Sequence, residues 1–253
     1  TLRAAIQEGN AETDPGVVEV IVVADDVFVG GAPGDDTSAS GDLDLHRPFR
    51  IVSESGAEEI LATAGGDRTF DLFAGADLVL RNLRVQNLGT PTVDVGGIIR
   101  SQGALITIDR TALHGGRALN DGGTIHSDRP VSLVDSQLSN GIAVSGSGGA
   151  LVAPSMTMLR SGIHGSSAVD AGAVFLTDGV VTSTMGASTI WATNSGASTV
   201  VAMGPFTVQD ATIANNTAPF GVLAGGAISI GNSLLTSADP NCFLPATSLG
   251  FNT

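Results

Sequence analysis

A short motif that recurs about every 25 residues constrains the fold of this chain more than any other feature of its sequence. It consists of two alternating apolar residues, two variable residues, a small residue, any residue and an aliphatic residue, as in 106–113 and 131–138. The closing aliphatic residues keep roughly this spacing over the last two thirds of the chain; they are Val85, Leu113, Leu138, Ile163, Ile190, Ile213 and Leu235.

A second aliphatic series runs between the members of the first and keeps the same step. Its members are Ile99, Ile125, Leu151, Val174, Val200 and Leu223. Repeats of this length are typical of solenoids, and the Leu and Asn signature of leucine-rich repeats is missing. The alternation at 106–108 indicates a strand with one buried face. The sequence therefore predicts an all-β, right-handed parallel β-helix with coils of about 25 residues.

The motif also predicts which side chains face the core. The inward parity shifts after the two variable residues, so we expect a bend there. The small residues should point inward, where their hydroxyls can bond to backbone or to one another; they are Thr111, Ser136, Ser161, Ser188 and Ser233. The preceding column should point outward. In it Arg110, Asp135 and Arg160 would form an ion ladder across coils rather than a catalytic trio.

A further turn is predicted two residues after each closing aliphatic residue. This column holds Asn87, Gly115, Asn140, Gly165, Ala192, Asn215 and Ser237. Asn and Gly tolerate left-handed backbone angles better than other residues do.

We expect one domain over residues 1–253. Residues 1–11 form a short amphipathic helix with apolar side chains at 2, 5 and 6. Because the end of a solenoid exposes core and strand edges, this helix is predicted to cap it. Residues up to about 70 follow the repeat less regularly, and residues 239–253 lack it, so the latter are predicted to be an exit segment.

The charge balance limits the partners. The formal net charge is −14, and all of the basic side chains are arginines. A chain this acidic repels nucleic acid and anionic membranes, which require basic surfaces. No run of about 18 apolar residues is present, so we also expect no membrane insertion by this segment.

Several segments resemble the CSLREA-domain proteins in order along the chain. The opening, Thr-Leu-Arg-Ala-Ala-Ile-Gln-Glu-Gly-Asn-Ala at 1–11, is similar to the opening of that family, with Ala4 where the family has Glu. Further similar segments are 41–45, 49–52, 68–71, 231–235 and 239–242.

The resemblance implies an exported bacterial protein of choice-of-anchor type with a right-handed parallel β-helix, within the pectate-lyase-like and polymorphic outer-membrane-protein-like group. It implies an extracellular or cell-surface location and a partner cysteine beyond Cys242. The expected function is a non-enzymatic structural or adhesive module at the cell surface. Its expected partner is a surface glycan or another copy of a surface protein.

The alternative is a carbohydrate-active β-helix enzyme, either a polysaccharide lyase or a glycoside hydrolase. Its candidate catalytic residues are Asp25, Asp26, Asp35 and Asp36 with Arg68, or Arg100 in place of Arg68. Glycosidases use paired carboxylates, which this acidic segment could supply. The companion motifs of polygalacturonases do not follow residues 34–36, so the sequence favours the non-enzymatic reading and leaves catalysis open.

Two ligand sites are candidates independently of catalysis. Asp35, Asp36, Asp42 and Asp44 offer carboxylate oxygens to a weakly bound Ca²⁺, the one cofactor that the sequence suggests. Trp191, the only tryptophan, follows a core position and should point outward, where its ring could stack on a sugar. His114 and His164 share one column two coils apart and are expected to be surface residues.

Overall fold

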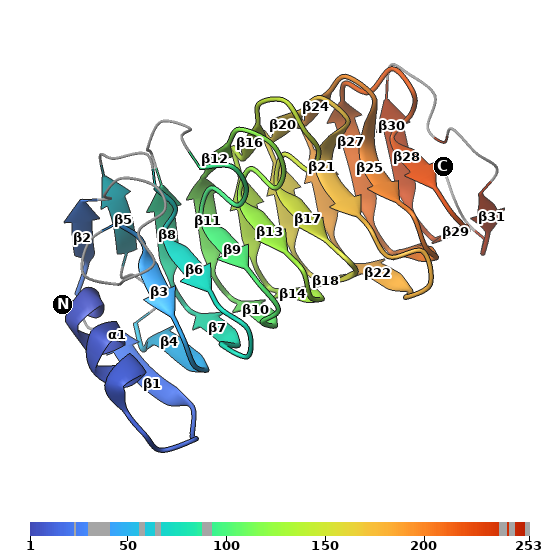
Figure 1. Ribbon diagram of the computed structural model, residues 1–253. Coiled ribbons are helices and arrows are strands. Elements are labelled where there is room, and N and C mark those ends of the chain that lie inside the picture. Colours follow the sequence, from blue (N-terminus) through green and yellow to red (C-terminus); the bar gives the residue numbers. More distant parts are fainter. Residues whose placement is uncertain are drawn as a thin grey trace.

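The computed structural model shows a parallel β-solenoid with coils of about 26 residues and one N-terminal helix (Figure 1). It describes residues 1–22, 24–29, 41–55, 59–63, 67–87, 93–237, 242 and 246–250. The predictions of a parallel β-helix, of its coil length and of an N-terminal helix are confirmed. In these residues no helix is long and apolar enough to cross a membrane.

Three long sheets run along the described part of the solenoid, with a fourth, shorter sheet beside them. Sheet A contains β1 (Val18–Val22), β4 (Phe49–Ser53), β7 (Leu78–Arg81), β10 (Ile106–Asp109), β14 (Val131–Val134), β18 (Met156–Leu159), β22 (Ser183–Gly186), β26 (Phe206–Gln209), β29 (Ile228–Gly231) and β31 (Thr247–Ser248). Sheet B contains β2 (Asp26–Val29), β5 (Glu59–Thr63), β8 (Arg84–Asn87), β11 (Ala112–Gly115), β15 (Gln137–Ser139), β19 (Gly162–His164), β23 (Thr189–Trp191), β27 (Thr212–Asn216) and β30 (Leu234–Ser237).

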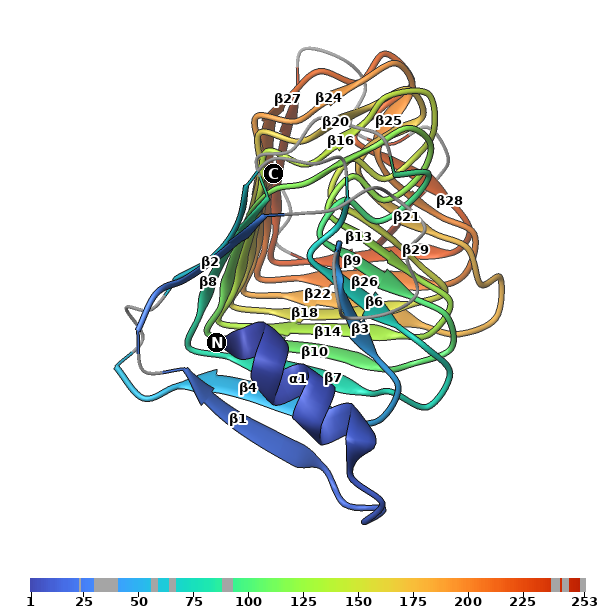
Figure 2. The ribbon, with the colours of Figure 1, turned by 60° about the vertical axis from the view of Figure 1, so that its left-hand side comes forward.

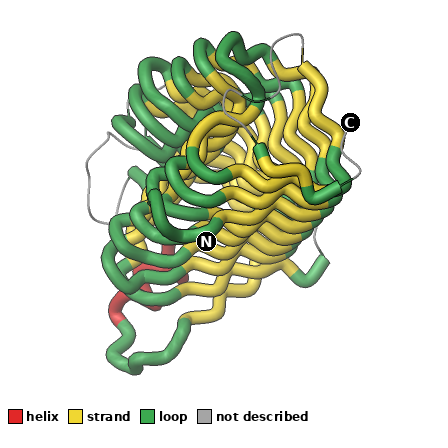
Figure 3. The backbone as a smooth tube through the Cα atoms, turned by 90° about the vertical axis from the view of Figure 1, so that its right-hand side faces the viewer, coloured by secondary structure: helices red, strands yellow, loops and turns green. Residues whose placement is uncertain are grey.

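Sheet C contains β3 (Leu43–Leu45), β6 (Phe70–Leu72), β9 (Ile99–Ser101), β13 (Ile125–Ser127), β17 (Leu151–Ala153), β21 (Ala171–Leu176), β25 (Ser198–Ala202) and β28 (Leu223–Gly225). Sheet D contains the short strands β12 (Arg117–Ala118), β16 (Ile142–Ala143), β20 (Ser167–Ala168) and β24 (Asn194–Ser195). Figure 3 shows the strands stacked in layers with loops at the corners. Sheet D was not predicted, because its strands are too short to show a period.

The register of sheets B and C confirms both aliphatic series. Leu113 pairs with Leu138, and Leu138 pairs with Ile163. In sheet C, Ile125 pairs with Ile99 on one side and Leu151 on the other. All of these side chains are fully buried, so each one packs on its counterparts in the neighbouring coils.

The same sheets continue into the N-terminal residues, where the sequence repeat is weak. In sheet A, Val18 pairs with Phe49 at the N-terminal end, whereas Phe206 pairs with Ile228 near the other end, so the first coil is the longer of the two. Longer coils at the N-terminus hide the period while preserving the stacking. Strands β3 and β5 were not predicted for this reason.

The corner between sheets A and B explains the recurring shape of the motif. The second variable residue has a positive φ in coil after coil, at Asn82, Arg110, Asp135, Arg160, Ala187, Asp210 and Asn232. The small residue that follows points inward, as predicted. The backbone N–H of Thr111 donates to Ser136 Oγ at 3.1 Å, and that of Ser136 donates to Ser161 Oγ at 3.0 Å. Each hydroxyl therefore satisfies a backbone donor in the coil before it.

The turn after sheet B uses the same backbone conformation. Positive φ angles occur at Gly115, Asn140, Gly165, Ala192 and Asn215, as the sequence predicted. Asn87 acts through its side chain instead, because its buried amide donates to the carbonyls of Asp67 and Gly97 at 2.9 Å each.

Helix α1 (Leu2–Ala11) covers the N-terminal end of the solenoid (Figure 2). Leu2 and Ile6 are buried in the core, and Gly9 is buried where a Cβ atom would lie 2.7 Å from the ring of Phe49. Arg3 Nη2 donates to the carbonyl of Gly41 at 2.6 Å, which attaches the helix to the coil below. The predicted capping role is consistent with these contacts.

The predicted exit segment, 239–253, lies mostly outside the described residues. Within it Thr247 and Ser248 form β31, which pairs in parallel with β29 and extends sheet A. This part of the segment therefore continues the solenoid rather than leaving it.

The corner between sheets A and B predicts a stabilising substitution. Ala187 is exposed and has a φ of 48°, a conformation that costs an L-residue about 1–2 kcal/mol. Ala187→Gly should raise the free energy of unfolding by about 0.5–1 kcal/mol, because relief of strain exceeds the entropy cost of glycine. Ala112→Gly, in strand β11 without a positive φ, should lower it by about 0.5–1 kcal/mol. Urea unfolding of the two variants measures both changes, and equal losses would contradict the strained corner.

Candidate functional site

Polar side chains gather in two regions of the described structure. One is an open groove along the corner between sheets A and B, continuous with the outer face of sheet B. The other is a buried cluster of aspartates and arginines near the N-terminal end.

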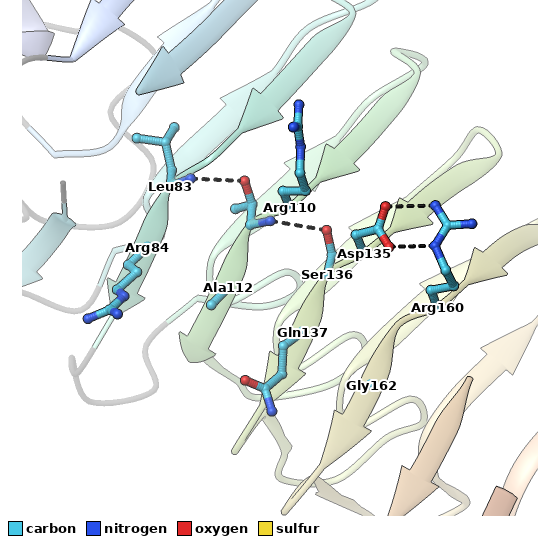
Figure 4. Close-up of a pocket in the computed structure, with 10 residues that line it drawn as sticks. Leu83, Arg84, Arg110, Ala112, Asp135, Ser136, Gln137, Arg160 and Gly162 are labelled. Atoms are coloured by element: carbon cyan, nitrogen blue, oxygen red, sulfur yellow. Dashed lines mark hydrogen bonds and ion pairs between the residues drawn. The ribbon is translucent and has the colours of Figure 1, made fainter. Parts of the chain in front are cut away.

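The corner groove has a volume of about 380 Å³ (Figure 4). Its lining residues are Leu83, Arg84, Arg110, Thr111, Ala112, Asp135, Ser136, Gln137, Arg160 and Gly162. Three arginines and one aspartate give this lining a formal charge of +2, although the whole chain carries −14. The groove lining therefore holds more basic than acidic side chains, unlike the chain as a whole.

The predicted ion ladder is present in part. Arg160 donates from Nε and Nη2 to the two carboxylate oxygens of Asp135, at 2.6 and 2.7 Å. This bond holds the pKa of Asp135 below its usual value. The predicted pairing of Arg110 with Asp135 is wrong, because Arg110 turns to the adjacent Asp109, at 3.4 Å. In Figure 4 the Arg110 side chain stands apart from the Asp135–Arg160 pair.

The outer face of sheet B beside the groove carries Trp191, and we call Gln137, Gly162, His164 and Trp191 the Trp191 face. The Trp191 ring stacks on His164 with a centroid distance of 4.4 Å and an interplanar angle of 20°. A Cβ atom on Gly162 would lie 3.2 Å from the ring, so the glycine provides space for it. Gln137 Nε2 lies 2.8 Å from His164 Nε2. Trp191 is half-buried and lies on the outer face, as predicted.

Gln137 and Gly162 belong both to the corner groove and to the Trp191 face, so the two surfaces are continuous.

Burial lowers the pKa of His164, with a smaller effect of the nearby His114. The shift favours the neutral imidazole, which can both donate and accept a hydrogen bond. Together the surfaces offer an aromatic ring, neutral polar groups and guanidinium groups to one elongated ligand.

The buried region, which we call the aspartate–arginine cluster, consists of Asp42, Asp44, Asp67, Arg68, Asp71 and Arg100. Asp44 on β3 pairs in register with Asp71 on β6, which pairs in turn with Arg100 on β9. Arg68 Nη1 donates to Asp71 Oδ2 at 3.1 Å, and Arg100 Nε donates to Asp71 Oδ1 at 2.8 Å. Arg100 Nη2 forms a second bond, to Asp71 Oδ2.

Burial and mutual repulsion disfavour the charged form of the carboxyl groups in this cluster. Burial raises the pKa of Asp42 to about 8, and the nearby Asp67, Asp44 and Asp71 add to the effect. Burial also raises the pKa of Asp67, against the hydrogen bond from the Arg68 backbone. Arg68 Nε is 3.9 Å from Asp42 Oδ2, a weaker contact than its bond to Asp71.

The predicted site residues are distributed over different parts of the chain. Asp25 is exposed and lines a separate hollow with Thr1, Leu2 and Val20. Arg68 is buried in the aspartate–arginine cluster. The structure does not place these two residues in one hollow.

The remaining candidates divide in the same way. Asp35, Asp36 and the side chain of Asp26 lie outside the described residues. Asp42 and Asp44 lie in the aspartate–arginine cluster, so two of the four predicted Ca²⁺ ligands are brought together.

Sequence reasoning missed Asp67 and Asp71 as members of this cluster. A signal was present, since 43–45 and 70–72 share the same alternation of apolar and acidic residues. The second aliphatic series begins at Ile99. Extending it by two coils towards the N-terminus aligns Asp44 with Asp71, and both of them with Arg100.

The stacking of Trp191 on His164 predicts that removal of the tryptophan ring changes the pKa of His164. Trp191→Ala should raise the pKa of His164 towards its usual value of 6.5, because the substitution exposes the imidazole to water. NMR titration of the His164 ring measures the shift. Phe220→Ala removes an exposed ring elsewhere and should leave this pKa unchanged. An unchanged pKa in Trp191→Ala would show that the stacking does not bury His164.

No protein-family model, curated protein or solved structure matches this chain. The resemblance of its opening residues to the CSLREA-domain proteins therefore stays a prediction.

Proposed function

We propose that this chain is a rigid structural and adhesive module of an exported protein at a cell surface, and that it binds surface glycans along the corner groove and the Trp191 face. The observation that carries the proposal is the half-buried ring of Trp191 on the outer face of sheet B, stacked on His164 beside an arginine-lined groove. The export and surface location rest on the sequence resemblance.

The solenoid suits a structural role. Each described coil bonds to its neighbours through parallel ladders in three long sheets, so bending the axis would strain many hydrogen bonds together. The stacking also repeats the outer side chains at the spacing between coils, about 4.8 Å. Such a surface can contact successive units of an extended chain.

The chemistry of the surface favours an anionic glycan. The Trp191 ring has an apolar face that can lie on a sugar ring. Arg84 and Arg110 supply guanidinium groups, which pair with carboxylates and sulfates through several donors. An anionic ligand is attracted to this groove despite the negative charge of the whole chain.

Binding accounts for the groove better than hydrolysis does. Asp135 is the one carboxylate among the described residues that line it, and both of its oxygens accept bonds from Arg160. A glycosidase requires two carboxyl groups that face the scissile bond. The aspartates that the enzyme hypothesis names as catalytic candidates lie away from the groove or outside the described residues.

The proposal predicts binding to uronic-acid, sialylated or sulfated oligosaccharides on a glycan array. Because Trp191 is the only tryptophan, its fluorescence should change on binding. Trp191→Ala should weaken binding by roughly thirtyfold, corresponding to about 2 kcal/mol. Arg84→Ala should weaken it by roughly tenfold or more and reduce its salt dependence.

Arg129→Ala removes an exposed arginine outside the groove and should leave binding unchanged. Loss of binding in Arg129→Ala equal to that in Arg84→Ala would contradict a defined site. The same oligosaccharides, incubated with the chain and Ca²⁺, test the alternative. Release of unsaturated products or new reducing ends would support a carbohydrate-active enzyme instead.

A further inference from the structure

The aspartate–arginine cluster carries a buried charge imbalance. Asp42, Asp44, Asp67 and Asp71 are exposed by 2, 0, 5 and 1%, respectively. When all groups are ionised, four carboxylates and the guanidiniums of Arg68 and Arg100 leave a net charge of −2. Burying unbalanced charge is costly, so such groups bind a proton or a counter-ion.

The positive charge within the cluster is directed to one carboxylate. Arg68 and Arg100 both donate to Asp71, and Arg100 does so through two atoms. Among the described residues, the Asp42 carboxylate is approached by Arg68 Nε at 3.9 Å, which is too far for a hydrogen bond. Its Oδ1 atom is buried and accepts no hydrogen bond from any group in the described structure. A buried carboxylate oxygen without a donor indicates that a cationic partner belongs beside it.

The positions of the carboxylates fit a calcium ion. One oxygen each from Asp42, Asp44 and Asp71 lie within 4.8 Å of one another. Ca²⁺ binds oxygen ligands at about 2.3–2.6 Å, so two ligands on opposite sides of the ion are separated by up to about 5 Å. The three oxygens are therefore close enough together to share one Ca²⁺ ion. Mg²⁺ requires near-ideal octahedral geometry and usually keeps several waters, so a buried site of three carboxylates favours Ca²⁺.

We propose that Asp42, Asp44 and Asp71 bind one Ca²⁺ ion, which balances the charge of −2 and joins the first coils of sheet C. The two arginines hold Asp71 in place. They also reduce the charge of the four carboxylates from −4 to −2, which one divalent cation neutralises. The backbone carbonyls of Gly41 and Asp42 accept bonds from Arg3 of α1. The ion thus stabilises the coil to which the N-terminal helix is attached.

The experiment compares thermal unfolding and calorimetric binding of the whole chain, dialysed against EGTA, on addition of CaCl₂ or MgCl₂ at pH 7.5. We expect one Ca²⁺ to bind per chain and the Tm to rise by roughly 5 °C or more at a hundredfold excess over Kd. The same concentration of MgCl₂ should produce a much smaller shift.

Asp42→Asn is the decisive variant, because it keeps the shape of the side chain and removes one ligand charge. Without metal it should unfold at a higher temperature than the native chain, since it removes a buried negative charge. It should lose the response to Ca²⁺. Asp128→Asn, the same change at an exposed aspartate, should keep that response. Absence of Ca²⁺ binding by the native chain, or an equal Tm shift in Asp42→Asn, would overturn the proposal.

Discussion

The parallel hydrogen-bond ladder between coils is the constraint on which the rest of this structure depends. Each described strand bonds to the equivalent strand one coil away and not to its neighbour in sequence, as Ile106 on β10 does with Val131 on β14. A displacement of one residue would turn every buried side chain of that strand outward. The register is therefore determined by the aliphatic columns, and it places every outer residue beside its equivalent in the next coil. Both candidate sites are consequences of that alignment.

The corners between sheets show how the ladder is kept intact where the chain changes direction. After the left-handed residue at the first corner, the backbone N–H of the small residue that follows it has no carbonyl partner in the ladder. The inward hydroxyl of the next coil accepts its hydrogen bond instead. Ser136 and Ser161 thus replace the missing carbonyl at each step. This exchange explains why a small hydroxyl residue recurs there, although an aliphatic residue would contribute more to the core. It also leaves the corner side chains outside, where Asp135 and Arg160 meet.

The sequence predicted the parts of the fold that repeat with a regular step. The columns of Leu113 and Ile125 lie where their periods placed them, because burial constrains both series equally. The N-terminal coils were harder to predict, since the long first coil from Val18 to Phe49 obscures the period that later coils display. The candidate sites depend on individual side chains and were predicted less well. Trp191 was placed on the outer face, whereas the partner of Arg110 was not foreseen, because a side chain's choice between two carboxylates leaves no periodic signal.

The aspartate–arginine cluster spans β3, β6 and β9, near the N-terminal end of the solenoid. In sheet C the column that begins with Asp44 and Asp71 continues through Arg100 to His126 and Val152, so its polarity falls as the coils proceed. Carboxylates at its first two positions introduce a repulsion that the arginine of the third coil relieves only in part. The cluster therefore depends on correct alignment of three coils, and this dependence links the order of the N-terminal coils to the cap that Arg3 attaches to them.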